Sequence, residues 1–100
     1  MISVVAVLTA KPGEAPALIA AVQANLEAVR AEAGCIEYGP AQDAPFSPAK
    51  FGEDCVIVLE KWASAEALAA HGKAPHMAAF SASIRDILAG RPSIHILAPA

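Results

Sequence analysis

The chain has 100 residues, enough for one domain over residues 1–100, and 56% of them are hydrophobic whereas 17% are charged. Its formal net charge of −3 excludes the basic field with which proteins bind nucleic acid or an anionic membrane surface. No apolar run reaches the ~18 residues of a membrane span, and residues 1–13 lack the basic start of a signal peptide. The apolar excess suggests a surface reserved for a second subunit.

The two cysteines, Cys35 and Cys55, show no ladder-like spacing. We therefore expect two small, buried, reduced thiols in a cytoplasmic protein. A disulfide between neighbouring strands is the less favoured alternative.

The first predicted element is a strand over Ile2–Thr9, a β-branched run that ends at a Lys-Pro-Gly breaker. Apolar residues then recur with helical spacing from Glu14 to Ala33, which predicts one helix closed by Gly34. The stripe leaves Glu32 and two other charged residues on or near the solvated side. Nothing in this helix looks catalytic, so we expect it to serve in packing.

A second strand is predicted over Cys35–Gln42, with Ile36 and Tyr38 on one face. Pro40 cannot donate a ladder hydrogen bond, so this strand belongs at an edge or carries a bulge. The segment 43–54 contains two prolines, a glycine and two phenylalanines that we expect to be exposed. A loop of this length is either a lid or binding loop, or a disordered connection.

The strongest strand pattern is that of Cys55–Trp62, where most positions on both faces are apolar. Ser64 can cap a short helix over Ala65–His71. A second helix is predicted over residues 75–88, because proline suits a first helical position and an apolar stripe follows it. The last predicted strand is Ser93–Leu97.

The order β-α-β-β-α-β predicts the α+β class and a ferredoxin-like sandwich, in which both helices cover one face of a four-stranded antiparallel sheet. The other face of such a sheet is normally polar. Here Val5, Val7, Ile57 and Leu59 alternate with further apolar residues, so neither face is polar. We therefore predict a homodimer through the bare sheet face.

The residues best suited to chemistry lie between Val56 and Phe80. His71 and His76 flank a Gly-Lys-Ala-Pro break between two helices. Either histidine could act as a general base near neutral pH, or could merely complement the dipole at a helix end. A metal site is disfavoured, because only Glu60 and Glu66 are available as further ligands.

Trp62 stands at the end of its strand, where core packing competes with a role as a flat wall for an aromatic ligand. Glu60 shares its face, which predicts a buried carboxylate in need of a partner. That partner could be a histidine, Arg85, Arg91 or a group from a second subunit. Tyr38 could be exposed or line a pocket, and His95 is expected to be a hydrogen-bonded sheet residue.

Several well-known cofactor signatures are missing from the sequence. It has no glycine-rich phosphate loop, no GxSxG, no CxxC and no haem-attachment motif. An enzyme built on this chain would work with little or no bound cofactor.

A set of residues in the third strand and the two helices after it resembles the antibiotic biosynthesis monooxygenase family. The similarity extends over nearly the whole chain and is greatest to the small bacterial quinol monooxygenases, including an I-x-I-L-x-P ending at residues 94–99. The matching residues of the central segment are Glu60, Lys61, Trp62, Ser64, Glu66, Leu68, His71, Pro75, His76, Met77 and Phe80.

The resemblance implies a dimeric α+β barrel that oxidises a phenolic or quinol-like substrate with O2, without metal, flavin or haem. It implies His71 or His76 as the base and Glu60 or Tyr38 as an orienting partner. Trp62, Phe80, Met77 and Tyr38 would then be the substrate-binding residues.

Two departures from relatives bear on the substrate. Val58 and Leu68 stand where the actinorhodin-pathway members carry an Asn and a Tyr, so that polar constellation is absent. Haem-degrading relatives have a ligating His where this chain has Ser81 or Ala82, which disfavours haem degradation. The alternative from another class is a non-catalytic dimeric barrel that binds small hydrophobic or quinone ligands.

Overall fold

The computed structural model describes residues 1–100, and all eight of its elements pack into one α+β unit. The predicted β-α-β-β-α-β order is confirmed, except that each helical crossover consists of two pieces. In chain order the elements are β1 (Ile2–Thr9), α1 (Ala15–Ala24), α2 (Leu26–Arg30), β2 (Cys35–Ala41), β3 (Cys55–Trp62), α3 (Ala65–Gly72), α4 (Pro75–Ile84) and β4 (Ser93–Leu97).

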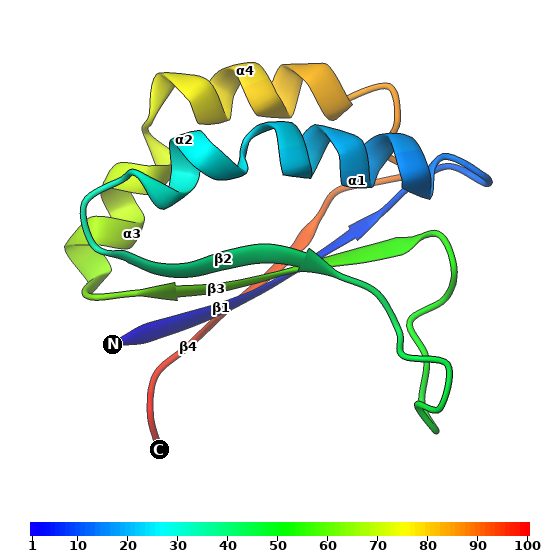
Figure 1. The fold of residues 1–100 in the computed structure, drawn as a ribbon, viewed down its shortest axis with the longest axis horizontal. Coiled ribbons are helices and arrows are strands. Elements are labelled where there is room, and N and C mark those ends of the chain that lie inside the picture. The colour runs from blue at the N-terminus through cyan, green and yellow to red at the C-terminus, as the bar shows by residue number, and fades with distance from the viewer.

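The four strands form one antiparallel sheet in the order β2-β3-β1-β4. Helices α1, α2 and α4 lie over one face of this sheet (Figure 1), as the ferredoxin-like fold requires. The register places Tyr38 opposite Glu60, Glu60 opposite Val4, and Val4 opposite Ile96. These four side chains therefore form one row across the sheet on its helix-covered face, since directly paired residues share a face.

The prediction of one continuous helix over residues 14–33 is wrong. The helix breaks at Asn25, whose side-chain Nδ2 donates a hydrogen bond to Sδ of Met77 at 3.4 Å. Asn is disfavoured in a helix interior, and the side chain of Asn25 is bonded to the neighbouring helix α4. The turn after α2 then leads down to the sheet through Gly34, whose φ is +83°.

The helix predicted over residues 75–88 ends earlier, at Ile84. The residues after it pair with the end of β1 and the residues that follow it. The N–H of Lys11 donates to the carbonyl of Ile87, and the N–H of Ala89 donates to the carbonyl of Thr9, both at 2.8 Å. These long-range bonds take the backbone groups that a longer helix would have used.

Strand β2 is an edge strand, as Pro40 predicted, but the expectation that Ile36 and Tyr38 share a face is wrong. The register shifts by one residue between Cys35 and Glu37, which makes Ile36 the extra residue of a β-bulge. Ile36 is 56% exposed as a result, whereas Tyr38 is 4% exposed and points under the helices. The bulge therefore aims Tyr38 into the interior.

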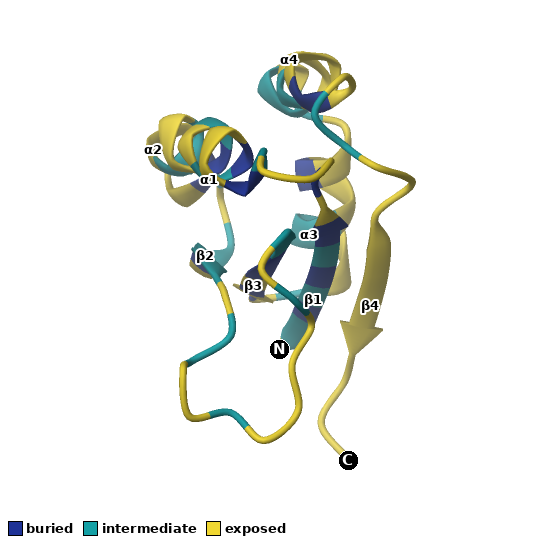
Figure 2. Cartoon of the chain, turned by 90° about the vertical axis from the view of Figure 1, so that its right-hand side faces the viewer, coloured by how far each residue is buried: buried dark blue, intermediate teal, exposed yellow.

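The core lies between the sheet and the helices and contains the fully buried Trp62, Leu18, Val22, Val29 and Val56. The opposite face of the sheet carries the second apolar set that the sequence predicted, with Leu59 44% and Leu97 50% exposed. Figure 2 shows that β4 is exposed along its whole length at the edge of the sheet. The homodimer remains a prediction.

The 43–54 loop is held together by its own side chains. The carboxylate of Asp43 accepts hydrogen bonds from the N–H groups of Phe51 and Gly52 at 3.0 and 2.9 Å, which lowers the pKa of Asp43. Phe46 is 87% and Phe51 59% exposed, as predicted. No residue of this loop lines the main cavity of the chain.

The two cysteines are free, and each is half-buried rather than buried as expected. Cys35 pairs with Trp62 at one end of β3, and Cys55 lies at the other end. Seven residues of strand separate these ends by about 23 Å, far beyond the ~7 Å limit for a disulfide.

Candidate functional site

A cavity of about 480 Å³ lies between the helix-covered face of the sheet and helices α3 and α4. This volume is in the range of pockets that take small organic ligands. Thirteen of its 19 lining residues are hydrophobic, so it favours an apolar ligand. Its ionisable or hydroxyl side chains are Tyr38, Glu60, His71, Lys73 and Ser81.

Glu60 is a buried carboxylate, as its face on β3 predicted, with 8% of its surface exposed. Its partner is the neighbouring Trp62, whose indole Nε1 donates a hydrogen bond to Oε1 at 2.9 Å. Burial raises the pKa of Glu60, and the indole hydrogen bond and the nearby His71 only partly offset this effect. The carboxyl group is thus poised to hold a proton more readily than an exposed glutamate.

Tyr38 lies opposite Glu60 in the sheet and lines the same cavity. Burial, with the negative charges of Glu60 and Glu32 adding to it, raises the pKa of the Tyr38 phenol well above its usual value. Tyr38 therefore keeps its proton and can offer a ligand a neutral O–H. Its strand is tied to α2, because Nε and Nη2 of Arg30 donate to the Tyr38 carbonyl at 3.1 and 2.9 Å.

His71 comes from the last turn of α3, a helix that starts where the Ser64 hydroxyl accepts a hydrogen bond from the N–H of Ala67 at 3.1 Å. Its imidazole lies against the Trp62 ring, with centroids 4.6 Å apart, and edge-on to Tyr38 at 5.6 Å. His71 as a whole is only 6% exposed. These contacts hold the imidazole in one orientation at the cavity wall.

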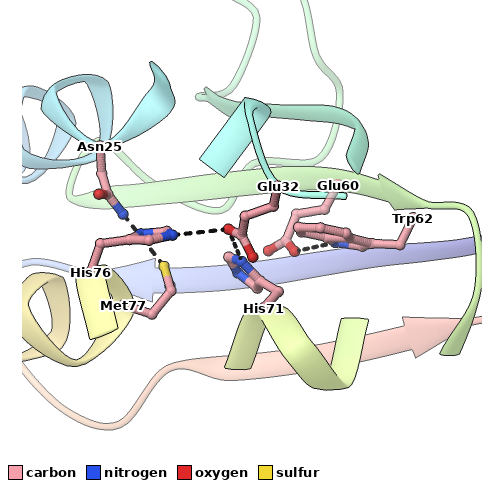
Figure 3. Close-up of polar contacts among 7 residues, drawn as sticks. All are labelled: Asn25, Glu32, Glu60, Trp62, His71, His76 and Met77. Atoms are coloured by element: carbon pink, nitrogen blue, oxygen red, sulfur yellow. Dashed lines mark hydrogen bonds and ion pairs between the residues drawn. The ribbon is translucent and has the colours of Figure 1, made fainter. Parts of the chain in front are cut away.

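The carboxylate of Glu32 joins the two histidines that the sequence singled out (Figure 3). Its Oε2 lies 2.8 Å from Nδ1 of His71 and 3.2 Å from Nε2 of His76. The first contact is a hydrogen bond, whereas the second is a close approach without hydrogen-bond geometry. The Glu32 side chain is 15% exposed, so its expected position on the solvated side is wrong.

Gly34 makes this approach possible. A Cβ atom at Gly34 would lie 2.5 Å from Cβ of Ala67, closer than such atoms ever come. The bare glycine lets the turn before β2 pack directly on α3, and the N–H of Ala63 donates to the Gly34 carbonyl at 2.8 Å. The turn carries Glu32 to His71 in this way.

The structure brings five of the seven predicted site residues to the cavity wall and leaves two behind it. Trp62 is fully buried and contacts His71 and Glu60 rather than the cavity. His76 also lies outside the lining, beyond Glu32, and its two ring nitrogens are buried. The five residues at the wall are Tyr38, Glu60, His71, Met77 and Phe80.

Glu32 is the site residue that reasoning on the sequence missed. The helical spacing predicts a helix as far as Ala33, although Gly34 marks the end of the helix only two residues after Glu32. A residue in the turn that ends a helix need not follow the face of that helix, and this signal could have identified Glu32. His95 is hydrogen-bonded as expected, with Nε2 2.7 Å from the Ser93 hydroxyl.

No three His, Cys, Asp or Glu side chains are arranged to hold a metal ion. Likewise, none of the helices has both the length and the apolar character to cross a membrane.

The fold and the site together define a ferredoxin-like α+β domain with an apolar ligand cavity and a histidine–carboxylate pair at its wall. The sequence profile of the family described as antibiotic biosynthesis monooxygenase matches residues 1–83. The chain is also 32% identical over 104 residues to "Probable quinol monooxygenase YgiN" of Escherichia coli, with 99% of this chain and 98% of that protein covered. The chain belongs to the antibiotic biosynthesis monooxygenase family.

Solved structures agree with this assignment. Rv0793 from Mycobacterium tuberculosis superposes with a TM-score of 0.83 at 26% identity, covering 99% of this chain and 94% of that chain. PA3566 from Pseudomonas aeruginosa gives a TM-score of 0.81 at 29% identity, with coverage of 99% and 93%. The resemblance read from the sequence is therefore confirmed at the level of family and fold.

Proposed function

We propose that the protein is a monooxygenase that oxidises a quinol-like or polyphenolic aromatic with O2 and needs no bound cofactor. The observation that carries this proposal is the His71 imidazole, which lines an apolar cavity while its Nδ1 bonds to the Glu32 carboxylate. A base of this kind can take the proton of a phenol. The relative named as a probable quinol monooxygenase supports the same substrate class.

The reaction begins when Nε2 of His71 takes the proton of a substrate O–H group. The resulting phenolate gives one electron to O2, which makes a phenoxyl radical and superoxide. The two combine through a new C–O bond at a ring carbon that carries hydrogen. His71 returns its proton to the terminal peroxide oxygen. The carbon then loses its hydrogen as the O–O bond breaks, so that one oxygen atom ends in a carbonyl and the other in water.

The chain's own residues serve this sequence in three ways. The apolar walls, which include Met77 and Phe80, keep water from the radical pair and pack on the ring of the substrate. The Tyr38 hydroxyl, which keeps its proton, donates a hydrogen bond to the second oxygen of a quinol, and the Glu60 carboxyl group at the same wall helps to orient it. His71 alone moves the proton. A planar, uncharged diol of one to three rings fits this arrangement best.

We further propose that the functional unit is a homodimer through the bare sheet face. Ile94 and Ile96 line the cavity from β4 and are still 63% and 61% exposed, so the cavity is open along this edge in a single chain. A second copy that covers the apolar sheet face and this edge would close the site. The two unpaired thiols are compatible with the predicted cytoplasmic location.

Oxygen uptake with menadiol tests the proposal. We expect the wild type to exceed the autoxidation rate and His71→Ala to lose roughly 10²-fold or more of that excess, because general base catalysis contributes about 10²–10⁴-fold. His76→Ala should lose less, since His76 is outside the cavity lining. Gln23→Ala, at an exposed position on α1 away from the cavity and the bare sheet face, is the control and should keep the wild-type rate.

A wild-type rate equal to that of menadiol without protein would refute the enzyme. Saturable quenching of Trp62 fluorescence by menadione in that case would support the non-catalytic binding barrel. A Soret band on haem titration would instead favour haem chemistry.

A further inference from the structure

We infer that Glu32 is a positioning residue, which fixes His71 as its Nδ1–H tautomer and so leaves Nε2 as the basic nitrogen at the cavity. This inference rests on the proposed function for its catalytic consequence, but not for the tautomer itself. Glu32 does not line the cavity and cannot touch a substrate there. It acts through His71 only.

The hydrogen-bond geometry leads to this tautomer. Nδ1 of His71 lies 2.8 Å from Oε2 of Glu32, and a carboxylate can only accept, so the proton belongs on Nδ1. Nε2 of His71 makes no hydrogen bond within the chain and, unlike the ring nitrogens of His76, it is not fully buried, in a residue that lines the cavity. The bond at one ring nitrogen thus decides which nitrogen is free to take a proton.

His76 holds Glu32 from the other side. Its Nε2 lies 3.2 Å from the same carboxylate oxygen, although neither ring nitrogen of His76 makes a hydrogen bond. His76 therefore restricts the carboxylate by close packing, while the hydrogen bond to His71 holds it on the other side.

Several ionisable groups surround Glu32 and His71. Glu60 and Tyr38 face His71 from the sheet. Cys35 lies near Glu32, and its pKa is raised by burial first and by the Glu32 carboxylate second. When His71 takes the substrate proton, the imidazolium forms next to Glu32, and the negative charge stabilises it. Glu32 should therefore affect the catalytic step more than substrate binding.

Nitrogen NMR on protein labelled with ¹⁵N-histidine tests the tautomer directly, without any substrate. In the wild type we expect the shifts of neutral His71 to report a protonated Nδ1 and an unprotonated Nε2. Glu32→Ala should abolish this pattern and give a mixture of tautomers. Glu32→Gln should largely preserve the pattern, because the amide oxygen can accept the same bond without its charge.

Menadiol kinetics then measure the consequence. We expect Glu32→Ala to lower kcat roughly 10–100-fold, as removal of a partner that orients a functional histidine commonly does, with KM changed less than about threefold. Glu32→Gln should fall between wild type and Glu32→Ala. Glu27→Gln, which removes the same charge from an exposed position on α2, is the matched control and should leave both constants unchanged.

Two results would overturn the inference: a wild-type His71 protonated on Nε2, or Glu32→Ala with wild-type tautomer and kcat. Urea unfolding of each variant separates these outcomes from loss of the fold. If the wild type shows the expected tautomer but no menadiol oxidation, the positioning stands and the proposed function fails. The two ideas can thus fail separately.

Discussion

Gly34 offers a direct test of how the turn before β2 builds the site. Its φ is +83°, and an added Cβ would lie 2.5 Å from Cβ of Ala67. Gly34→Ala therefore has two costs: left-handed backbone disfavours a residue with Cβ by about 1–2 kcal/mol, and overpacking against α3 costs about 1–3 kcal/mol. Together they amount to about 2–5 kcal/mol, a large share of the ~5–15 kcal/mol that stabilises a domain.

The strain should also reach the site. The turn or α3 must move by several tenths of an ångström to relieve the contact, and this movement separates Glu32 from His71. We therefore expect Gly34→Ala to lower the free energy of unfolding in urea by about 2–5 kcal/mol. In addition, the ¹⁵N shifts of His71 should move toward those of Glu32→Ala.

The chain provides a control for each cost. Gly13 has a φ of +79° but nothing within 4 Å of an added Cβ, so Gly13→Ala carries only the backbone cost. Ala67→Gly in the Gly34→Ala background removes the clashing methyl group, at a helix-propensity cost of about 1 kcal/mol. The double variant should regain the wild-type His71 shifts. If Gly34→Ala is no less stable than Gly13→Ala, the close packing described here is refuted.

Two further predictions concern the buried carboxylate and the bare sheet face. Because the folded-state pKa of Glu60 is raised, protonation of Glu60 favours the folded state. This stabilisation is fully present below the unfolded pKa of about 4.3 and is lost as the pH rises through the folded pKa. Glu60→Gln keeps an acceptor for the Trp62 indole, so urea unfolding over a pH series should show a flatter dependence for the variant; parallel curves would contradict the burial effect. Leu59→Lys places a charge on the bare face at a position 44% exposed, and sedimentation equilibrium should show that it shifts a dimer toward monomer while Ala69→Lys on α3 does not. A wild type that sediments as a monomer at all concentrations would refute the proposed homodimer.

Local patterns along the chain were enough to predict the order of the elements and the ferredoxin-like topology. Alternation in β1 and β3 placed the strands, the Ser64 cap and the proline at position 75 placed two helix starts, and the shared face of Glu60 and Trp62 predicted a buried carboxylate. These features depend on neighbours within a few residues, where spacing alone carries the information. The motif residues between Glu60 and Phe80 likewise sufficed to identify the family.

Only the tertiary structure decided how the site is assembled. The helix break at Asn25 and the bulge at Ile36 depend on contacts with distant segments, so they shifted boundaries and turned Tyr38 inward. Glu32 and His71 are 39 residues apart in the chain, and no local pattern predicts their contact. Their meeting depends on a glycine that lets two backbones approach, and for that reason a residue assigned to the solvated face of a packing helix lies between the two histidines.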